Sequence, residues 1–184
     1  MSTLPDRPAT ALVVIDVQND VMAAAHRSAE VIATIGGLVD SARRQGVPVV
    51  WVQHSDEGMV AGTDAWAYVP ELVRRESEPL VHKHHGDSFE GTDLEEVLAG
   101  AGVGRLLVAG AETDACIRST IHGAFTRGYD VTLVSDAHTA SDMSEWGGLK
   151  PEAAIANVNL YWQFQSAPGR TAAVSTAAEV AFAG

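Results

Sequence analysis

The feature that most constrains the fold of this chain is an alternation of short apolar runs with helical patterns. Each run is continuously apolar, as in a strand that is buried on both faces of a sheet. Between the runs lie helical patterns, of which residues 28–45 form the longest. We therefore expect an α/β fold with three layers, α/β/α, around a Rossmann-like parallel sheet of about six strands. The predicted strands are Ala11 to Ile15, Val47 to Val52, a third that begins at Leu80 and Val81 and runs out over residues 82–85, Arg105 to Ala109, Val131 to Ser135 and a short sixth at Thr171 to Ser175.

The size and charge of the chain limit the classes of protein to which it can belong. Its 184 residues suit one domain, 1–184, with an N-terminal extension at 1–9 and a C-terminal tail at 160–184 that could lie in an oligomer interface. The net charge of −12 argues against nucleic acid or an anionic membrane as a partner, because either would require a basic face. One cysteine cannot form an internal disulfide, and residues 1–10 lack the apolar core of a signal peptide. We expect a cytoplasmic protein.

Polar residues just past the strands are the candidates for function, because ligands of open parallel sheets bind beyond the carboxyl ends of the strands. Asp16 follows the first strand, Lys83 closes the third, and Cys116 follows the fourth. A thiol becomes a nucleophile when a carboxylate accepts its proton, and a lysine can stabilise the negative charges. Each residue also has a structural interpretation: a turn aspartate, a lysine that reaches solvent, a buried cysteine. Further candidates at strand ends are His54, Asp56, Asp136 and His138.

Cys116 is predicted to lie in the first turn of a helix. The helical pattern opens near Thr113, carries an apolar stripe that includes Ile117 and Ile121, and stops at Gly128. The N-terminus of a helix offers free N–H groups and the positive end of the helix dipole, which lower a thiol pKa and can hold an anion. We therefore expect a thiol of lowered pKa beside a place for an oxyanion.

Three segments of the chain resemble the isochorismatase-like cysteine hydrolases, the superfamily that includes nicotinamidases and N-carbamoylsarcosine amidase. The first, residues 11–20, reads ALVVIDVQND. The second, residues 81–89, reads VHKHHGDSF, and the third, residues 110–116, reads GAETDAC. Their order and spacing agree with the family over about residues 10–140. The resemblance therefore implies the fold and the reaction type of this superfamily, in addition to what the residues indicate by themselves.

The resemblance implies a mechanism for these residues. Cys116 would form a thioester with the substrate, Asp16 would act as acid and base, and Lys83 would keep the site electropositive. The backbone N–H groups of Glu112 and Cys116 would form the oxyanion hole. Family members carry a non-proline cis peptide at the position that corresponds to Ala111–Glu112.

The sequence departs from the family pattern where a metal or substrate would bind. Val21 stands where the family usually has phenylalanine. Metal-dependent nicotinamidases have Asp-x-His after the second strand, whereas this chain has His54 and Asp56 in the reverse order, with no histidine in residues 57–81. The histidines at 82, 84 and 85 alternate faces on a strand, so at most two could converge. His54 and Asp56 could ligate a metal, but a solvated loop is the favoured interpretation, so we expect no metal and no cofactor. The candidate pocket residues are Val21, His54, Trp66 and Phe89.

These observations predict a hydrolase that cleaves a non-peptide C–N bond in a small amide, carbamoyl compound or cyclic amide. The first alternative is a catalytically silent protein of the same fold that binds a small molecule or senses redox state through its thiol. A less favoured one is an isochorismatase-type vinyl-ether hydrolase, since that reaction does not need a thiolate. The three filled catalytic positions favour the amidohydrolase. The expected partners are a small-molecule substrate and further copies of the chain in a homodimer or homotetramer.

Overall fold

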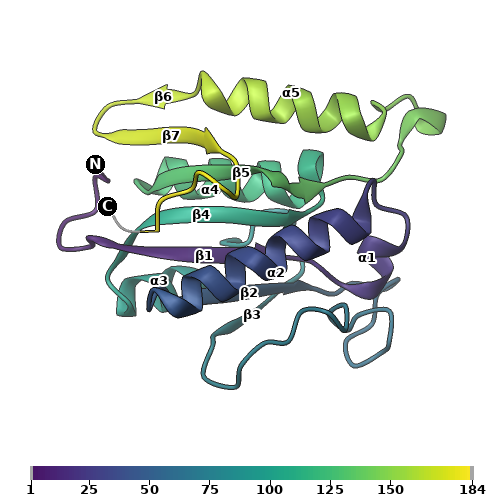
Figure 1. The fold of residues 1–184 in the computed structure, drawn as a ribbon, viewed down its shortest axis with the longest axis horizontal. Helices are drawn as coiled ribbons and strands as arrows, with labels where there is room; N and C mark the ends of the chain where they lie inside the picture. Colours follow the sequence, from purple (N-terminus) through teal and green to yellow (C-terminus); the bar gives the residue numbers. More distant parts are fainter. Residues whose placement is uncertain (1, 183–184) are drawn as a thin grey trace.

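One seven-stranded sheet forms the centre of the computed structural model, which describes residues 2–182 (Figure 1). The strand order is β3-β2-β1-β4-β5-β7-β6, and all neighbours are parallel except β6 and β7. The expected parallel α/β fold is confirmed, with one strand more than expected, because the two-residue β6 is too short to leave a pattern. The strands are β1 (Ala9–Ile15), β2 (Val49–His54), β3 (Leu80–Lys83), β4 (Val103–Ala111), β5 (Asp130–Thr139), β6 (Ser166–Ala167) and β7 (Arg170–Ser175).

Helices cover both faces of the sheet, with α2 in front and α4 behind in the view of Figure 1. Leu12 and Val14 of β1 pack in one apolar core with α2, whereas Val13 and Ile15 pack in a second core with α3, α4 and α5. Alternation of side chains along a strand buried on both faces produces this three-layer arrangement. The helices are α1 (Asn19–Ala23), α2 (Ser28–Arg44), α3 (Leu94–Gly100), a π-helix (Thr113–Ile117), α4 (Arg118–Arg127), a 3₁₀ turn (Ser144–Trp146) and α5 (Pro151–Gln163).

The sequence also suggests one or two helical turns over Pro70 to Arg75 and a capping box over Thr92 to Glu95, and both predictions are wrong. Residues 70–75 do not form helical turns, because Val69 and Leu72 bury their side chains in the core beneath α2 and hold the segment in an irregular path. The capping box at the start of α3 does not form either. The Thr92 hydroxyl donates to the Ser88 carbonyl (2.6 Å), and Asp93, which precedes the helix, makes no side-chain cap.

The C-terminal part of the chain completes the sheet and one core. After α5, β7 pairs with β5, and Phe182 packs in the core on the α2 face. Among the described residues, none of the helices combines the length and the apolar character that crossing a bilayer would demand.

A close approach between β1 and β4 fixes the geometry of the sheet centre. Ile15 pairs with Gly110, whose φ is +128°. A Cβ built at Gly110 would lie 2.0 Å from the Ile15 carbonyl oxygen, so only glycine fits. The chain therefore leaves these two strands from adjacent positions, at Asp16 and at the Ala111–Glu112 peptide.

Candidate active site

Asp16 is held in an unusual backbone conformation directly after β1. Its φ of +52° lies in the left-handed region, which costs a residue other than glycine about 1–2 kcal/mol and which aspartate tolerates better than most. Its N–H donates to the Val52 carbonyl (2.9 Å), and the residue is only 2% exposed. Oδ1 has no hydrogen-bond partner in the structure. Residues held in such conformations cluster at functional sites.

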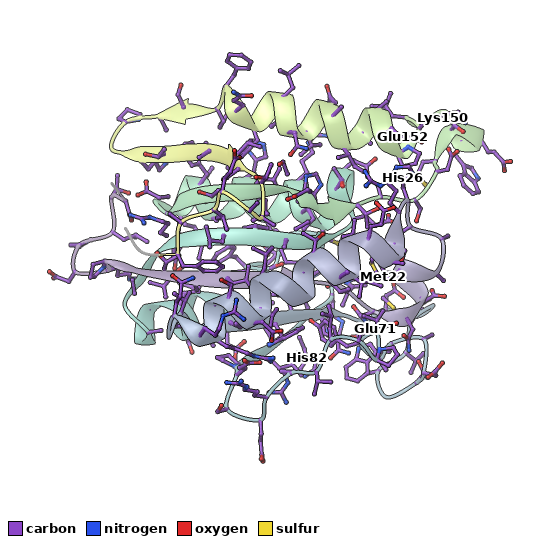
Figure 2. All side chains as sticks on the ribbon, in the orientation of Figure 1. Met22, His26, Glu71, His82, Lys150 and Glu152 are labelled. Carbon is purple, nitrogen blue, oxygen red and sulfur yellow. The ribbon has the colours of Figure 1, made fainter. Side chains whose placement is uncertain are left out.

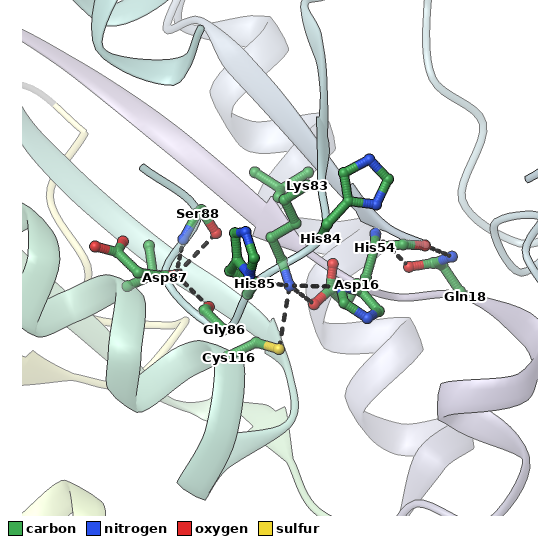
Figure 3. Close-up of polar contacts among 12 residues, drawn as sticks. Asp16, Gln18, His54, Lys83, His84, His85, Gly86, Asp87, Ser88 and Cys116 are labelled. Atoms are coloured by element: carbon green, nitrogen blue, oxygen red, sulfur yellow. Dashed lines mark hydrogen bonds and ion pairs between the residues drawn. The ribbon is translucent and has the colours of Figure 1, made fainter. Parts of the chain in front are cut away.

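Lys83, the last residue of β3, brings the other two strand ends together. Its side chain is fully buried, and its Nζ lies 2.7 Å from Oδ2 of Asp16 and 3.2 Å from Sγ of Cys116 (Figure 3). The ammonium also donates to the His85 carbonyl (3.1 Å) and approaches Nδ1 of His54 (3.4 Å). A buried ammonium requires such partners. The three residues singled out in the sequence therefore meet at one cation.

Cys116 lies on a π-helical turn whose start is held in place by a series of hydrogen bonds between buried side chains. The expected helix is present, but its first turn is the π-helix, which continues into α4. His138 Nε2 donates to Oδ1 of Asn159 (3.0 Å), so its Nδ1 accepts from the Thr113 hydroxyl (2.8 Å). Burial lowers the His138 pKa, which keeps the ring neutral as this arrangement requires. Residues on α5 and β5 thus fix the start of the turn that presents the thiol.

The expected lowered thiol pKa is wrong. Burial and the negative charge of Asp16 raise the pKa of Cys116 to about 11, and the Lys83 ammonium offsets only part of this. Burial also raises the Asp16 pKa although Lys83 opposes it, and Lys83 keeps a raised pKa because Asp16 outweighs the burial that would lower it. At neutral pH the thiol is therefore protonated. A buried carboxylate of raised pKa beside it is suited to accept its proton.

A cavity of about 290 Å³ opens onto these residues. Val21 and His54 line it, as expected from the sequence. Trp66 and Phe89 are not among the lining residues: Phe89 packs in the core against Tyr129, and Trp66 stacks on His82. His82 lies on β3, the edge strand of the sheet (Figure 2). The lining residues are Asp16, Asp20, Val21, His54, Glu112, Ala115, Cys116 and Ser141.

Two residues that the sequence interpretation missed support this site. Gln18 is fully buried, and its side-chain amide donates to the His54 carbonyl (2.9 Å) while its oxygen accepts from the His54 N–H (2.9 Å). Ser141 binds Oε1 of Glu112 through both its N–H (3.1 Å) and its hydroxyl (2.5 Å). Gln18 falls within the same family-like segment as Asp16, and this position was the only sign in the sequence that Gln18 belongs to the site. Nothing in the sequence links Ser141 to Glu112, 29 positions away.

The peptide bond between Ala111 and Glu112 is cis, as expected. Within residues 2–182, the Glu112 N–H has no hydrogen-bond partner. This N–H lies at the end of β4, in a residue that lines the same cavity as the thiol. It can therefore serve a negatively charged oxygen.

The histidines near the site make separate contacts. His54 accepts from Lys83 through Nδ1, so its Nε2 donates to Asp56 (3.1 Å). His84 contacts the Ser55 carbonyl (2.8 Å), and the His82 ring lies on Trp66. In the part of the chain that the structure describes, no three His, Cys, Asp or Glu side chains are grouped so that they could hold a metal ion.

Comparisons with known proteins identify the family of the chain. Residues 10–161 match the family model "Isochorismatase domain". The chain is 36% identical over 138 residues to the uncharacterized isochorismatase family protein YddQ of Bacillus subtilis, which covers 70% of this chain and 76% of that protein. It is 32% identical to a streptothricin hydrolase of Streptomyces noursei, over 78% of this chain and 59% of that protein. A crystal structure of an isochorismatase from Pseudomonas putida superposes with a TM-score of 0.83 at 26% identity, over 96% of this chain and 92% of that one.

Proposed function

The chain belongs to the isochorismatase family of hydrolases, and from that premise we propose that it cleaves the C–N bond of a small non-peptide amide, carbamoyl compound or cyclic amide. One observation carries the proposal. A single buried ammonium, that of Lys83, contacts both the Asp16 carboxylate and the Cys116 sulfur at a cavity. This arrangement combines a nucleophile, a base and an electrostatic stabiliser.

The first half of the reaction forms a thioester. The Cys116 thiol gives its proton to the Asp16 carboxylate, and the sulfur attacks the carbonyl carbon of the substrate. Negative charge moves to the carbonyl oxygen, where the backbone N–H groups of Glu112 and Cys116 stabilise it. Asp16 then protonates the leaving nitrogen, the C–N bond breaks, and an amine or ammonia departs. The raised pKa of Asp16 favours this cycle, because the carboxyl group must both take and return a proton.

The second half restores the enzyme. Asp16, again a carboxylate, takes a proton from water, and the hydroxide attacks the thioester carbonyl. The C–S bond breaks, the acid departs, and the sulfur recovers its proton from Asp16. Lys83 stays charged throughout and limits the cost of the thiolate that forms in each half.

The alternative of a redox-sensing thiol is weaker on structural grounds. Susceptibility to oxidation follows thiolate character and exposure. Cys116 is partly buried and has a pKa raised to about 11, so little thiolate exists at neutral pH. A silent protein that only binds a small molecule would leave the contact between Lys83 and the thiol without a role.

The test is the release of ammonia or amine from a panel of small amides, ureides and lactams, with wild type beside Cys116→Ala. We expect release by wild type, and a loss of about a thousandfold or more in the variant. Release that is equal in both proteins would exclude the thioester route. An absence of release by wild type across the panel would favour the silent alternative.

A further inference from the structure

The carboxylates that line the cavity differ in what balances their charge. Asp16 pairs with Lys83, which is fully buried behind the cavity wall. Glu112 is held through Oε1 by Ser141, and its Oε2 has no partner among the described residues. Asp20, exposed in the first turn of α1, also forms no side-chain contact within residues 2–182. No lysine or arginine is among the residues that line the cavity. Two negative charges therefore remain unbalanced beside the thiol.

Neighbouring cations do not compensate for this excess. Lys150, beside the start of α5 (Figure 2), pairs with Asp142 at 3.6 Å. His54, the one lining residue that can become cationic, directs Nε2 to Asp56 and faces Lys83 with Nδ1. Lys150 is thus already paired with an anion, and both ring nitrogens of His54 already have partners.

The fixation of Glu112 indicates that its carboxylate has a ligand-binding role. Two donors from Ser141 hold one oxygen in place and leave the other open. A group positioned in this way loses little freedom when it binds a ligand. Asp16 lines the same cavity, and its buried Oδ1 has no hydrogen-bond partner among residues 2–182, so the site holds an acceptor that no described residue uses.

We propose that the site selects amides that carry a cationic nitrogen, such as an ammonium, amidinium or guanidinium group. The cation binds the free oxygen of Glu112, with Asp20 at the rim adding to the attraction, and substrates that carry a carboxylate are repelled. This inference rests on the proposed function for its use of the cavity as a substrate site. The charge selectivity itself is a property of the cavity and can be measured without turnover.

The experiment uses two thiol reagents that differ in charge. They are 2-(trimethylammonium)ethyl methanethiosulfonate, a cation, and 2-sulfonatoethyl methanethiosulfonate, an anion. Each forms a disulfide with Cys116 and releases methanesulfinate, and intact mass measured over time gives the rate. The quantity of interest is the cation-to-anion rate ratio, divided by the same ratio for 2-mercaptoethanol at the same pH and low ionic strength. Because the same thiolate attacks both reagents, a change in the thiol pKa cancels in the ratio.

We expect a wild-type ratio of about tenfold or more in favour of the cation. Glu112→Gln keeps the acceptor for Ser141 and should lower the ratio severalfold, and Asp20→Asn should lower it less. Glu96→Gln changes the net charge equally, but lies on α3, near the opposite end of β4, and should change the ratio less than about twofold (Figure 1). Circular dichroism checks that each variant is folded, and Asp20→Asn, at an exposed position, provides the test if Glu112→Gln does not fold.

Two results would overturn the inference: a wild-type ratio equal to that of 2-mercaptoethanol, or equal effects of Glu112→Gln and Glu96→Gln. The second would mean that net charge, and not the cavity, attracts the cation. Either result leaves amide hydrolysis by Cys116 untouched. Conversely, a strong cation preference in a protein that hydrolyses no amide would support the inference while the proposed reaction failed.

Discussion

Asp16 and Glu112 each follow the end of one of two neighbouring strands, yet their carboxylates lie in opposite surroundings. Ile15, just before Asp16, pairs with Gly110, which lies two residues before Glu112. Asp16 is 2% exposed and contacts an ammonium, whereas Glu112 is half-buried, contacts a serine and forms no ion pair with any residue in 2–182. Burial with a cation suits a group that exchanges protons, and an open, fixed carboxylate suits a group that binds a charge. The same type of side chain can therefore serve catalysis at one strand end and recognition at the next.

The largest expected difference between the two carboxylates is in turnover. Asp16→Asn removes the proton acceptor, so kcat should fall about a thousandfold. Glu112→Gln should leave kcat within about threefold and raise KM for a cationic amide about tenfold, because it removes only a binding charge. Steady-state kinetics on one cationic amide measure both. Equal losses of kcat in the two variants would contradict the assignment of Asp16 to proton transfer and of Glu112 to substrate binding.

The next difference is in stability. Lys83→Met leaves the Asp16 carboxylate buried without its cation, which should cost about 3–5 kcal/mol of unfolding free energy at neutral pH. Glu112→Gln should cost about 0.5 kcal/mol or less. Denaturant unfolding measures both. The deficit of Lys83→Met should shrink as the pH falls, because protonation of Asp16, whose pKa burial raises, removes the unpaired charge. A deficit that is independent of pH would point to lost packing alone.

The pKa of the thiol gives a third comparison. The negative charge of Asp16 disfavours the Cys116 thiolate, so Asp16→Asn should move the thiol pKa down from about 11 while Lys83 remains beside the sulfur. Glu112→Gln should shift it in the same direction by less. The ultraviolet absorbance of the thiolate, followed against pH, reports both values. A thiol pKa that rises in Asp16→Asn would contradict the assigned electrostatics.

The smallest expected effect concerns the support of Glu112. Ser141→Ala removes one of two hydrogen bonds to its carboxylate and should weaken binding of a cationic amide by about 1 kcal/mol, roughly fivefold in KM. Within residues 2–182 no hydrogen bond joins Ser141 to Asp16, so kcat should hardly change. A fall in kcat as large as that in Asp16→Asn would assign Ser141 to the chemistry instead.

Much of the fold could be predicted because its strands are buried on both faces and are therefore continuously apolar. The ends of these apolar runs also predict the strand ends, and with them the positions of Asp16, Lys83 and Cys116. It could not locate β6, which pairs through Ser166 and Ala167 alone.

The pKa of the thiol could not be predicted in the same way. A helix start indicates a lowered value, but burial and the adjacent Asp16 determine the outcome, and both depend on the packed structure. The cavity walls were also only partly predictable. Phe89 belongs to the core, whereas Ser141 reaches the cavity from a segment with no distinctive pattern. Asp20 also lines the cavity, and it ends the segment 11–20 that resembles the family, but nothing in that segment singles out its side chain.

The proposed reaction requires a thioester at Cys116, and intact mass spectrometry of acid-quenched turnover mixtures tests for it directly. With any amide that the wild type hydrolyses, we expect a fraction of the protein to gain the mass of the acyl group. Peptide mapping should place that mass on Cys116, and hydroxylamine should remove it. Undiminished hydrolysis by Cys116→Ala, without any such adduct in wild type, would contradict the account.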